Sequence, residues 1–444
     1  MAFNDLREFI SFLEAEEELL RIRKPVDTKY EIAAYIRKMS DTKGPALLFE
    51  NVKSFDIPVV GGVFGTRKRA LLALGIKDGN YVDKFLQALD HPVAPKTVAS
   101  GPCKEVIYRG ADIDLTRFPH PLFSEKDAGR FITAGIAISK DPETGKKNTS
   151  IYRMQVKGRN RLGIKAQQLA RQHKKAEAKG EPLPVAIVIG TDPVLALATQ
   201  WQAPYGTDEM ELAGALRGEA IEVVKAETVN LEVPATAEIV IEGNILPNVR
   251  EEEGPFGEVS GYYNPSFPKP VIEVTAITHR KNPIYQAALT GMPTTENHVL
   301  KQIPLEATYY WELKKQHPGV TAVHFPSAGT VGFIAVIAVR QTQSCEARNI
   351  IATMLGSKRN KIIIVVDDDV DIYDMEKVLW AVATRSQPAE DVVVFPRLAG
   401  SGMDPTVGQM RITSAMGIDA TMPVGQPFPE IVKVPGVEDV SLDE

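Results

Sequence analysis

The sequence EEEGPFGEVSGYYN, residues 251–264, sets three consecutive acids before a glycine-proline turn and a fourth acid just after it. Acid runs of this kind usually lie in solvated loops. Here the turn over residues 254–257 reverses the chain, so Glu253 and Glu258 can converge on one pocket although they are five residues apart. Gly257 also permits a positive φ or a close backbone approach. The stretch therefore predicts a pair of carboxylates in one site.

The size and charge of the chain limit what it can be. Its 444 residues exceed one ordinary hydrophobic core, so we expect two or three domains. The composition, 44% apolar and 24% charged, is typical of a soluble globular protein. A net charge of −6 argues against binding to nucleic acid or to an anionic membrane. No apolar run reaches the roughly 18 residues that span a bilayer.

The cysteines and the first residues indicate a cytoplasmic protein. Cys103 and Cys345 are far apart and lack CxxC spacing, which argues against a disulfide framework or a zinc site. The opening residues MAFNDLREFI lack the basic and then apolar pattern of a secretory signal.

Hydrophobic periodicity predicts three regions. We expect an α/β domain over residues 1–115, opened by an amphipathic helix with Leu6 and Leu13 on its apolar face. Residues 116–304 are rich in strands, which favours a β-barrel or a mixed sheet with helical insertions. Residues 305–444 again alternate strands and helices and end in an extended tail. The strands predicted in the central region are 132–139, 150–156, 185–189, 238–242 and 271–277, and its helices are 167–178 and 209–217.

Two further central motifs carry polar groups. In NTSIYRMQV, residues 148–156, strict alternation puts Asn148 and Tyr152 on one face of a strand and Arg153 on the other. Asn148 and Arg153 can share a site only if Asn148 precedes the strand or a bulge re-aims it; an edge strand with a surface arginine is the alternative. Glu209 lies in the first turn of a predicted helix, where an acid can also be merely favourable to the helix dipole.

The central segment supplies an amide, a guanidinium and three carboxylates that could serve one catalytic site: Asn148, Arg153, Glu209, Glu253 and Glu258. An arginine that pairs with one acid keeps that acid ionised, whereas an acid in an apolar pocket has its pKa raised. One carboxylate could then orient a substrate while another donates a proton near neutral pH.

The chain resembles the UbiD-like family of decarboxylases, which use prenylated FMN. The resemblance rests on NTSIYRMQV, LPVAIVIGTDP (183–193), EMELAGALRGEAIEVVKAE (209–227), EGPFGEVSGYYNP (253–265), IIIVVDDDVD (362–371) and MGIDAT (416–421). It implies three domains over 1–115, 116–304 and 305–444, with N- and C-terminal α/β domains on either side of a central split β-barrel, flavin-reductase-like, that binds the flavin.

The resemblance also implies roles for individual residues. Arg153, Glu253 and Glu258 match the catalytic set, with Glu258 as the proton donor that Arg153 and Glu253 position. Asn148, Gln167 and Glu209 match the ligands of a divalent metal, Mn2+ or Mg2+, with K+ beside it. The residues that match the cofactor-lining positions are Asn148, Thr149, Ser150, Ile151, Tyr152, Arg153, Ala166, Gln167 and Glu209.

Two positions depart from the family pattern. Gln167 stands where the family commonly has a metal-binding histidine; an amide oxygen is a hard ligand that can replace it. Ala415 stands where many members have a lysine, and Arg411 or another cation could take over its contact.

The implied activity is reversible, non-oxidative decarboxylation of an aromatic, heteroaromatic or α,β-unsaturated carboxylic acid. CO2 and a flavin prenyltransferase that supplies the cofactor are the expected partners, and a homo-oligomer, dimer or hexamer, is the expected assembly. In the loop 291–300, Glu296 and His298 are candidate substrate readers. The alternatives are a metal-dependent hydrolase with paired carboxylates and a catalytically inert flavin-binding subunit.

Overall fold

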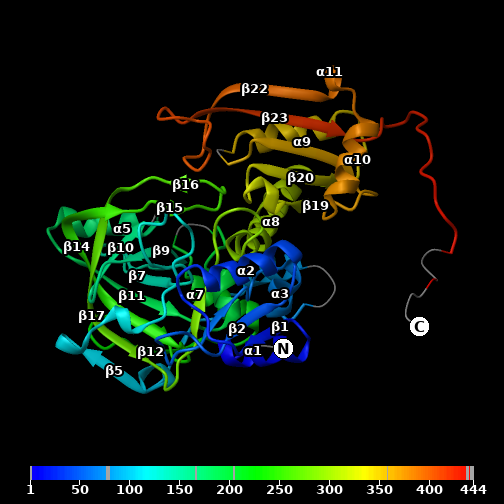
Figure 1. Cartoon of the computed structure of the whole chain (residues 1–444). Helices are drawn as coiled ribbons and strands as arrows, with labels where there is room; N and C mark the ends of the chain where they lie inside the picture. Colours follow the sequence, from blue (N-terminus) through cyan, green and yellow to red (C-terminus); the bar gives the residue numbers. More distant parts are fainter. Residues whose placement is uncertain are drawn as a thin grey trace.

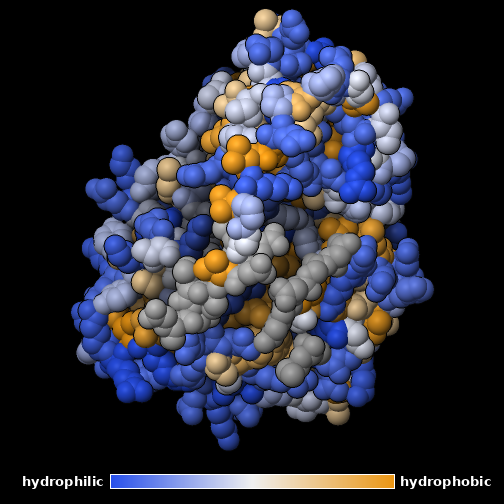
Figure 2. Space-filling model, turned by 90° about the vertical axis from the view of Figure 1, so that its right-hand side faces the viewer, coloured by the Kyte–Doolittle hydropathy of each residue, from blue (hydrophilic) through white to orange (hydrophobic). Residues whose placement is uncertain are grey.

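The protein has a mixed α/β fold (Figure 1). The structure is a computed structural model that describes residues 3–76, 81–165, 168–203, 206–357, 359–436 and 440. Within these residues the strands form sheets of four, nine, three, two and five strands. No helix in the described part of the chain is long and apolar enough to cross a membrane. The face in Figure 2 is largely hydrophilic, with apolar atoms in small patches.

The first helix follows from its sequence pattern. Asp5 caps it by accepting a hydrogen bond from the backbone N–H of Glu8, and the apolar positions, among them Leu6 and Leu13, are buried as predicted. The N-terminal elements are α1 (Leu6–Ala15), β1 (Leu19–Ile22), α2 (Glu31–Thr42), β2 (Ala46–Phe49), β3 (Val59–Gly61), α3 (Arg67–Ala73) and α4 (Tyr81–Asp90). Their four-stranded sheet, in the order β1-β2-β3-β18, is completed by β18 (Tyr285–Ala287) from far along the chain.

A nine-stranded sheet carries the central region. Its strands run in the order β6-β9-β10-β17-β14-β11-β7-β8, and β5 also pairs with β17. They are β5 (Val106–Arg109), β6 (Phe131–Ile132), β7 (Ile136–Lys140), β8 (Lys147–Ile151), β9 (Arg153–Val156), β10 (Arg161–Lys165), β11 (Leu183–Ile189), β14 (Ile239–Glu253) and β17 (Phe267–His279). The helices of this region are α5 (Gln168–Ala178), α6 (Pro193–Ala198) and α7 (Glu209–Arg217). Smaller sheets pair β4 (Lys96–Thr97), β12 (Glu222–Lys225) and β13 (Glu232–Pro234), and β15 (Phe256–Gly257) with β16 (Tyr263–Asn264).

A helix of 21 residues, α8 (Glu296–Gln316), leads from the central sheet to the C-terminal sheet (Figure 1). That sheet has the order β19-β20-β21-β23-β22. Its elements are β19 (Val320–His324), β20 (Ile334–Val339), α9 (Glu346–Leu355), β21 (Ile362–Asp367), α10 (Met375–Arg385), α11 (Pro388–Asp391), β22 (Val392–Ala399) and β23 (Ile412–Ala420). The chain beyond β23 has no helix or strand in its described part and extends away from the body, as expected.

The structure differs from the sequence-based expectation in two segments. The segment 291–300 is not a loop throughout, because α8 begins at Glu296 behind a Thr295 cap. The strand predicted over 238–242 is longer than expected, since β14 continues to Glu253 and its end is the acid run of the opening stretch. The pairing with β17 is irregular between Ile245 and Arg250, but it resumes over residues 250–253 and keeps the acid end of β14 in place.

A β-bulge in the β14–β17 pair gives a test of this register. The pairing skips one residue of β17 at Gly243, where an added Cβ would lie 2.3 Å from the carbonyl oxygen of Glu273. Gly243→Ala should therefore destabilise the protein by about 1–3 kcal/mol, seen as a lower temperature of thermal unfolding. Gly356→Ala is the control, because its Cβ would meet only Thr353 O at 3.6 Å. Equal unfolding temperatures for the two variants would contradict this register.

Candidate active site

One arginine joins the two acids of the turn. The Arg153 side chain donates from Nε and Nη2 to the two carboxylate oxygens of Glu253, each at 3.0 Å. Its Nη1 donates to Oε1 of Glu258. A guanidinium has donors on a rigid fork, so it can hold two carboxylates at fixed positions. Glu253 is fully buried and Glu258 is mostly buried. The predicted convergence of the two acids is present in the structure.

The central sheet sets this geometry. Glu253 is the last residue of β14, and Arg153 is the first residue of β9, paired in register with Lys165 at the end of β10. Lys165 Nζ lies 2.7 Å from Oε1 of Glu258, so Glu258 has two cationic partners. The turn between the acids is held by Asp127, which accepts a hydrogen bond from the N–H of Gly257 at 2.9 Å.

An aromatic ring covers the arginine. The Arg153 guanidinium lies over the Phe256 ring, 4.6 Å from its centroid. Phe256 is buried and packs on Phe131 with the ring centroids 4.4 Å apart. The ring attracts the cation and removes one approach for water, which strengthens the ion pairs.

The structure corrects the expected charge state of Glu258. Burial alone raises the pKa of Glu258, but the charges of Arg153, Lys165 and Lys301 outweigh burial and lower it. Glu258 is therefore ionised in the free protein, and it is not the acid of an apolar pocket that the sequence suggested. The sequence reasoning missed Lys165 and Lys301, which come from β10 and α8.

The strand NTSIYRMQV is interrupted at Tyr152. β8 ends at Ile151 and β9 begins at Arg153, while the N–H of Tyr152 donates to Gly135 O. The break re-aims the chain, which the sequence analysis required if Asn148 and Arg153 are to serve one site.

A polar pocket lies at the start of β8. Asn148 and Glu209 line it together with Lys146, Gln168, Gln172 and Trp201, among others. Oδ1 of Asn148 is buried without a hydrogen bond in the described structure, and so is Oγ1 of Thr149. The N–H of Thr149 donates to Oε2 of Glu209 at 2.9 Å, and burial raises the pKa of Glu209 to about 7. An unpartnered amide oxygen beside a poorly compensated carboxylate fits a hard divalent cation.

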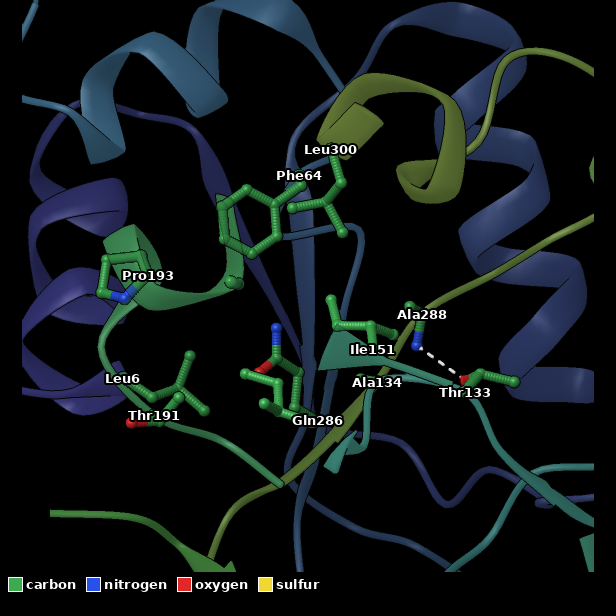
Figure 3. Close-up of a pocket in the computed structure, with 12 residues that line it drawn as sticks. Leu6, Phe64, Thr133, Ala134, Ile151, Thr191, Pro193, Gln286, Ala288 and Leu300 are labelled. Carbon is green, nitrogen blue, oxygen red and sulfur yellow. Dashed lines mark hydrogen bonds between the residues drawn. The ribbon is translucent and has the colours of Figure 1, made fainter. Parts of the chain in front are cut away.

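A second cavity is mainly apolar (Figure 3). Ile151 lines it, and because side chains alternate along a strand, Ile151 and Asn148 point to opposite faces of β8. Its other lining residues come from α1, α6, α8, the strands β7 and β18, and loops: Leu6, Phe64, Thr133, Ala134, Ile136, Thr191, Pro193, Ala196, Gln286, Ala288 and Leu300. Ser150 has another contact, donating from Oγ to Thr199 O at 3.3 Å.

Several predicted residues lie elsewhere or cannot be placed. Ala166 and Gln167 lie outside the described residues. His173, expected at the surface, is buried and close to Leu246 O at 3.2 Å. Ala415 is a buried residue of β23 in the C-terminal sheet, whereas Arg411 is exposed.

The two candidate substrate readers are built into the start of α8. Glu296 is fully buried and accepts hydrogen bonds from the N–H groups of Phe64 and Leu289, both at 3.2 Å. His298 is also fully buried: Nδ1 accepts from the N–H of Thr295, and Nε2 lies 2.8 Å from Val259 O. These contacts give both side chains structural roles at the start of α8, so we do not propose them as substrate readers.

Known families and structures match the chain along most of its length. Residues 10–89, 96–293 and 298–420 match the N-terminal, Rift-related and C-terminal domains described for the UbiD protein, 3-octaprenyl-4-hydroxybenzoate carboxy-lyase. An uncharacterized protein of Archaeoglobus fulgidus is 36% identical, with 95% of this chain and 92% of that protein covered.

Solved structures agree with this match. HmfF of Pelotomaculum thermopropionicum in complex with FMN is 41% identical, with 99% of each chain covered and a TM-score of 0.94. An evolved dimeric form of HmfF in complex with prFMN is 40% identical at a TM-score of 0.90, again with 99% of each chain covered. Vanillic acid decarboxylase of Sedimentibacter hydroxybenzoicus is 34% identical at a TM-score of 0.90, with 99% of this chain and 98% of that one covered.

The polar pocket gives a prediction that does not depend on turnover. Glu209→Gln keeps an acceptor for the Thr149 N–H but removes a poorly compensated buried charge. The metal-free variant should therefore unfold about 2–4 °C above the wild type, as expected for about 1 kcal/mol in a large domain. Added Mn2+ should raise the unfolding temperature of the wild type but not that of Glu209→Gln.

Glu211→Gln is the matched control, because Glu211 lies in the same first turn of α7. It should respond to Mn2+ as the wild type does. Equal stabilisation of Glu209→Gln by Mn2+ would show that Glu209 is only a helix-end acid.

Proposed function

The chain belongs to the UbiD family, and we propose that it is a prenylated-FMN-dependent decarboxylase acting reversibly and without net oxidation. Its substrates are aromatic, heteroaromatic or α,β-unsaturated carboxylic acids. The observation that carries this proposal is the Arg153 fork holding Glu253 and Glu258 in one buried site. The FMN and prFMN complexes of HmfF support a flavin as the cofactor.

The cofactor is held at the polar pocket in this proposal. Asn148 and Glu209, together with Gln167, would bind Mn2+ or Mg2+, with K+ beside it. The unpartnered Oδ1 of Asn148 and the carboxylate of Glu209 support this assignment. When bound, the prenylated flavin supplies an electron sink for the bond that breaks when CO2 leaves.

The wider architecture is part of the same proposal. We assign residues 1–115, 116–304 and 305–444 to three domains, with the central one a split β-barrel formed around the nine-stranded sheet. A flavin prenyltransferase supplies the cofactor, and the protein is a homo-oligomer. The dimeric form reported for HmfF is consistent with the oligomer.

Glu258 delivers the proton that replaces CO2, and Arg153 and Glu253 position it. Glu253 is fully buried and bound at both oxygens, so it is suited to orient the arginine. Glu258 is partly exposed, so of the two acids it is the one that a substrate can reach. A substrate carboxylate that approaches Arg153 and Lys165 adds a negative charge beside Glu258. That charge raises the pKa of Glu258 and favours its protonation, so substrate binding prepares the donor.

The absorbance spectrum of protein co-expressed with a flavin prenyltransferase tests the assignment. A bound modified flavin together with CO2 release from an unsaturated acid supports it. A colourless protein that hydrolyses a substrate would favour the paired-carboxylate hydrolase. Bound flavin without CO2 release from any acid would favour an inert flavin-binding subunit.

Glu258→Gln tests the proton donor. The amide is nearly the same size but cannot release a proton, so CO2 release should fall at least about a hundredfold while the flavin content stays unchanged. Glu251→Gln, on the same strand end but paired with Arg161 near the surface, should behave as the wild type. A flavin-loaded Glu258→Gln protein with wild-type turnover would refute the assignment.

Lys165→Met tests how the site controls the pKa of Glu258. Lys165 lowers this pKa in the free protein, so its removal should raise it. A general acid acts in its protonated form, so kcat/KM falls as pH rises through its pKa. The falling limb of the kcat/KM profile should therefore shift to higher pH in Lys165→Met. An unshifted or downshifted limb would mean that another group donates the proton.

A further inference from the structure

The side chain of Tyr152, which lies between β8 and β9, joins two elements that line the polar pocket. Nδ2 of Asn148, on β8, donates to the Tyr152 hydroxyl at 3.5 Å. The N–H of Leu169, in the first turn of α5, donates to the same oxygen at 3.3 Å. One hydroxyl therefore links the strand that carries Asn148 to the helix whose Gln168 lines the pocket.

The contact with Tyr152 decides which atom of the Asn148 amide is free to bind a ligand. An asparagine amide has an oxygen that accepts and a nitrogen that only donates, so one of its two orientations presents a ligand to a cation and the other does not. With Nδ2 bound to the hydroxyl, Oδ1 is left buried without a hydrogen bond in the described part of the chain. The opposite orientation would turn the N–H groups of the amide toward a cation, which they would repel.

The Tyr152 ring is held firmly enough to support the amide. It packs against the hydrophobic core of the central sheet. The backbone N–H of Tyr152 donates to the carbonyl oxygen of Gly135 at 3.2 Å, which fixes the break between β8 and β9. A hydroxyl at the end of a packed ring cannot follow a rotating amide, so its position selects one orientation of Asn148.

We propose that Tyr152 is a positioning residue for the divalent cation, because its hydroxyl holds the Asn148 amide with Oδ1 free to bind the metal. This inference rests on the proposed function, which assigns Asn148 and Glu209 to the metal. It adds a residue that acts through Asn148 and does not itself touch the metal. Partners that orient metal ligands in this way typically contribute about 10- to 100-fold to metal affinity.

Mn2+ binding to the full-length protein tests this role without turnover. Metal-free wild type and Tyr152→Phe are titrated with Mn2+ at saturating FMN, and free Mn2+ is measured by electron paramagnetic resonance. Tyr152→Phe keeps the packed ring and removes only the hydroxyl, so the fold should be retained. The dissociation constant for Mn2+ should rise about 10-fold or more.

A second substitution separates the orientation of the amide from a general effect on the pocket. A carboxylate has two equivalent oxygens and therefore no wrong orientation, so Asn148→Asp should bind Mn2+ with or without the hydroxyl. The double variant Asn148→Asp/Tyr152→Phe should bind Mn2+ as tightly as Asn148→Asp, within about twofold. The hydroxyl should thus matter only beside the amide.

Tyr309→Phe is the matched control. It removes the hydroxyl of another partly buried tyrosine, which lies 2.9 Å from Ser357 Oγ and does not line the polar pocket. The Mn2+ affinity of this variant should equal that of the wild type, so a loss in Tyr152→Phe would report on the pocket and not on the removal of a hydroxyl in general.

The outcomes distinguish this inference from the proposed function. Wild-type Mn2+ affinity in Tyr152→Phe would overturn the inference. An equal loss in the Asn148 and Asn148→Asp backgrounds would also overturn it, because the hydroxyl would then act through the start of α5 and not through the amide. A wild type that binds no Mn2+, or a Glu209→Gln variant that binds it as tightly as the wild type, would contradict the proposed metal site itself, and the inference would fall with it.

Discussion

The site depends on the three ion-pair contacts of one buried guanidinium. Arg153 holds both oxygens of Glu253 and one oxygen of Glu258, over the face of Phe256. Breaking a buried pair by removing one partner leaves an uncompensated charge, which typically costs about 3–5 kcal/mol. The ends of β14 and β9, and the turn with its Asp127 contact, must therefore keep their positions for both acids to stay bound to Arg153. The long pairing of β14 with β17 supplies that register.

This constraint explains the division of labour between the two acids. Glu253 lies inside the protein with both oxygens bound to Arg153, which suits the orienting role that we propose for it. Glu258 shares its charge among cations from β9, β10 and α8, and it keeps some exposure. Its pKa therefore responds to whatever anion enters the site. Helix α8 carries Lys301, which lowers the pKa of Glu258, and it also fixes the turn through His298, so one element affects both the charge and the position of Glu258.

Much of this organisation could be predicted from the sequence. The convergence of Glu253 and Glu258 followed from the turn between them, and the first helix followed from its periodicity and its cap. The contribution of Lys165 could not be predicted, because it depends on which strand lies beside β9. The buried state of Glu296 and His298 was missed for a similar reason. Polar residues at a helix start resemble loop residues in sequence, and only the packing of α8 against Phe64 and Val259 shows that they are enclosed.

The most direct measurement of the central claim is the conversion of an unsaturated acid to its decarboxylated product by flavin-loaded protein in D2O. Loss of CO2 requires the electron sink, and completion of the reaction requires a proton from the acid pair. The account predicts product with deuterium at the carbon that lost CO2 in the wild type, and loss of product formation in Arg153→Ala with flavin still bound, because Glu258 is then no longer held in place. Equal product formation in the two proteins, or none in a fully loaded wild type, would contradict it.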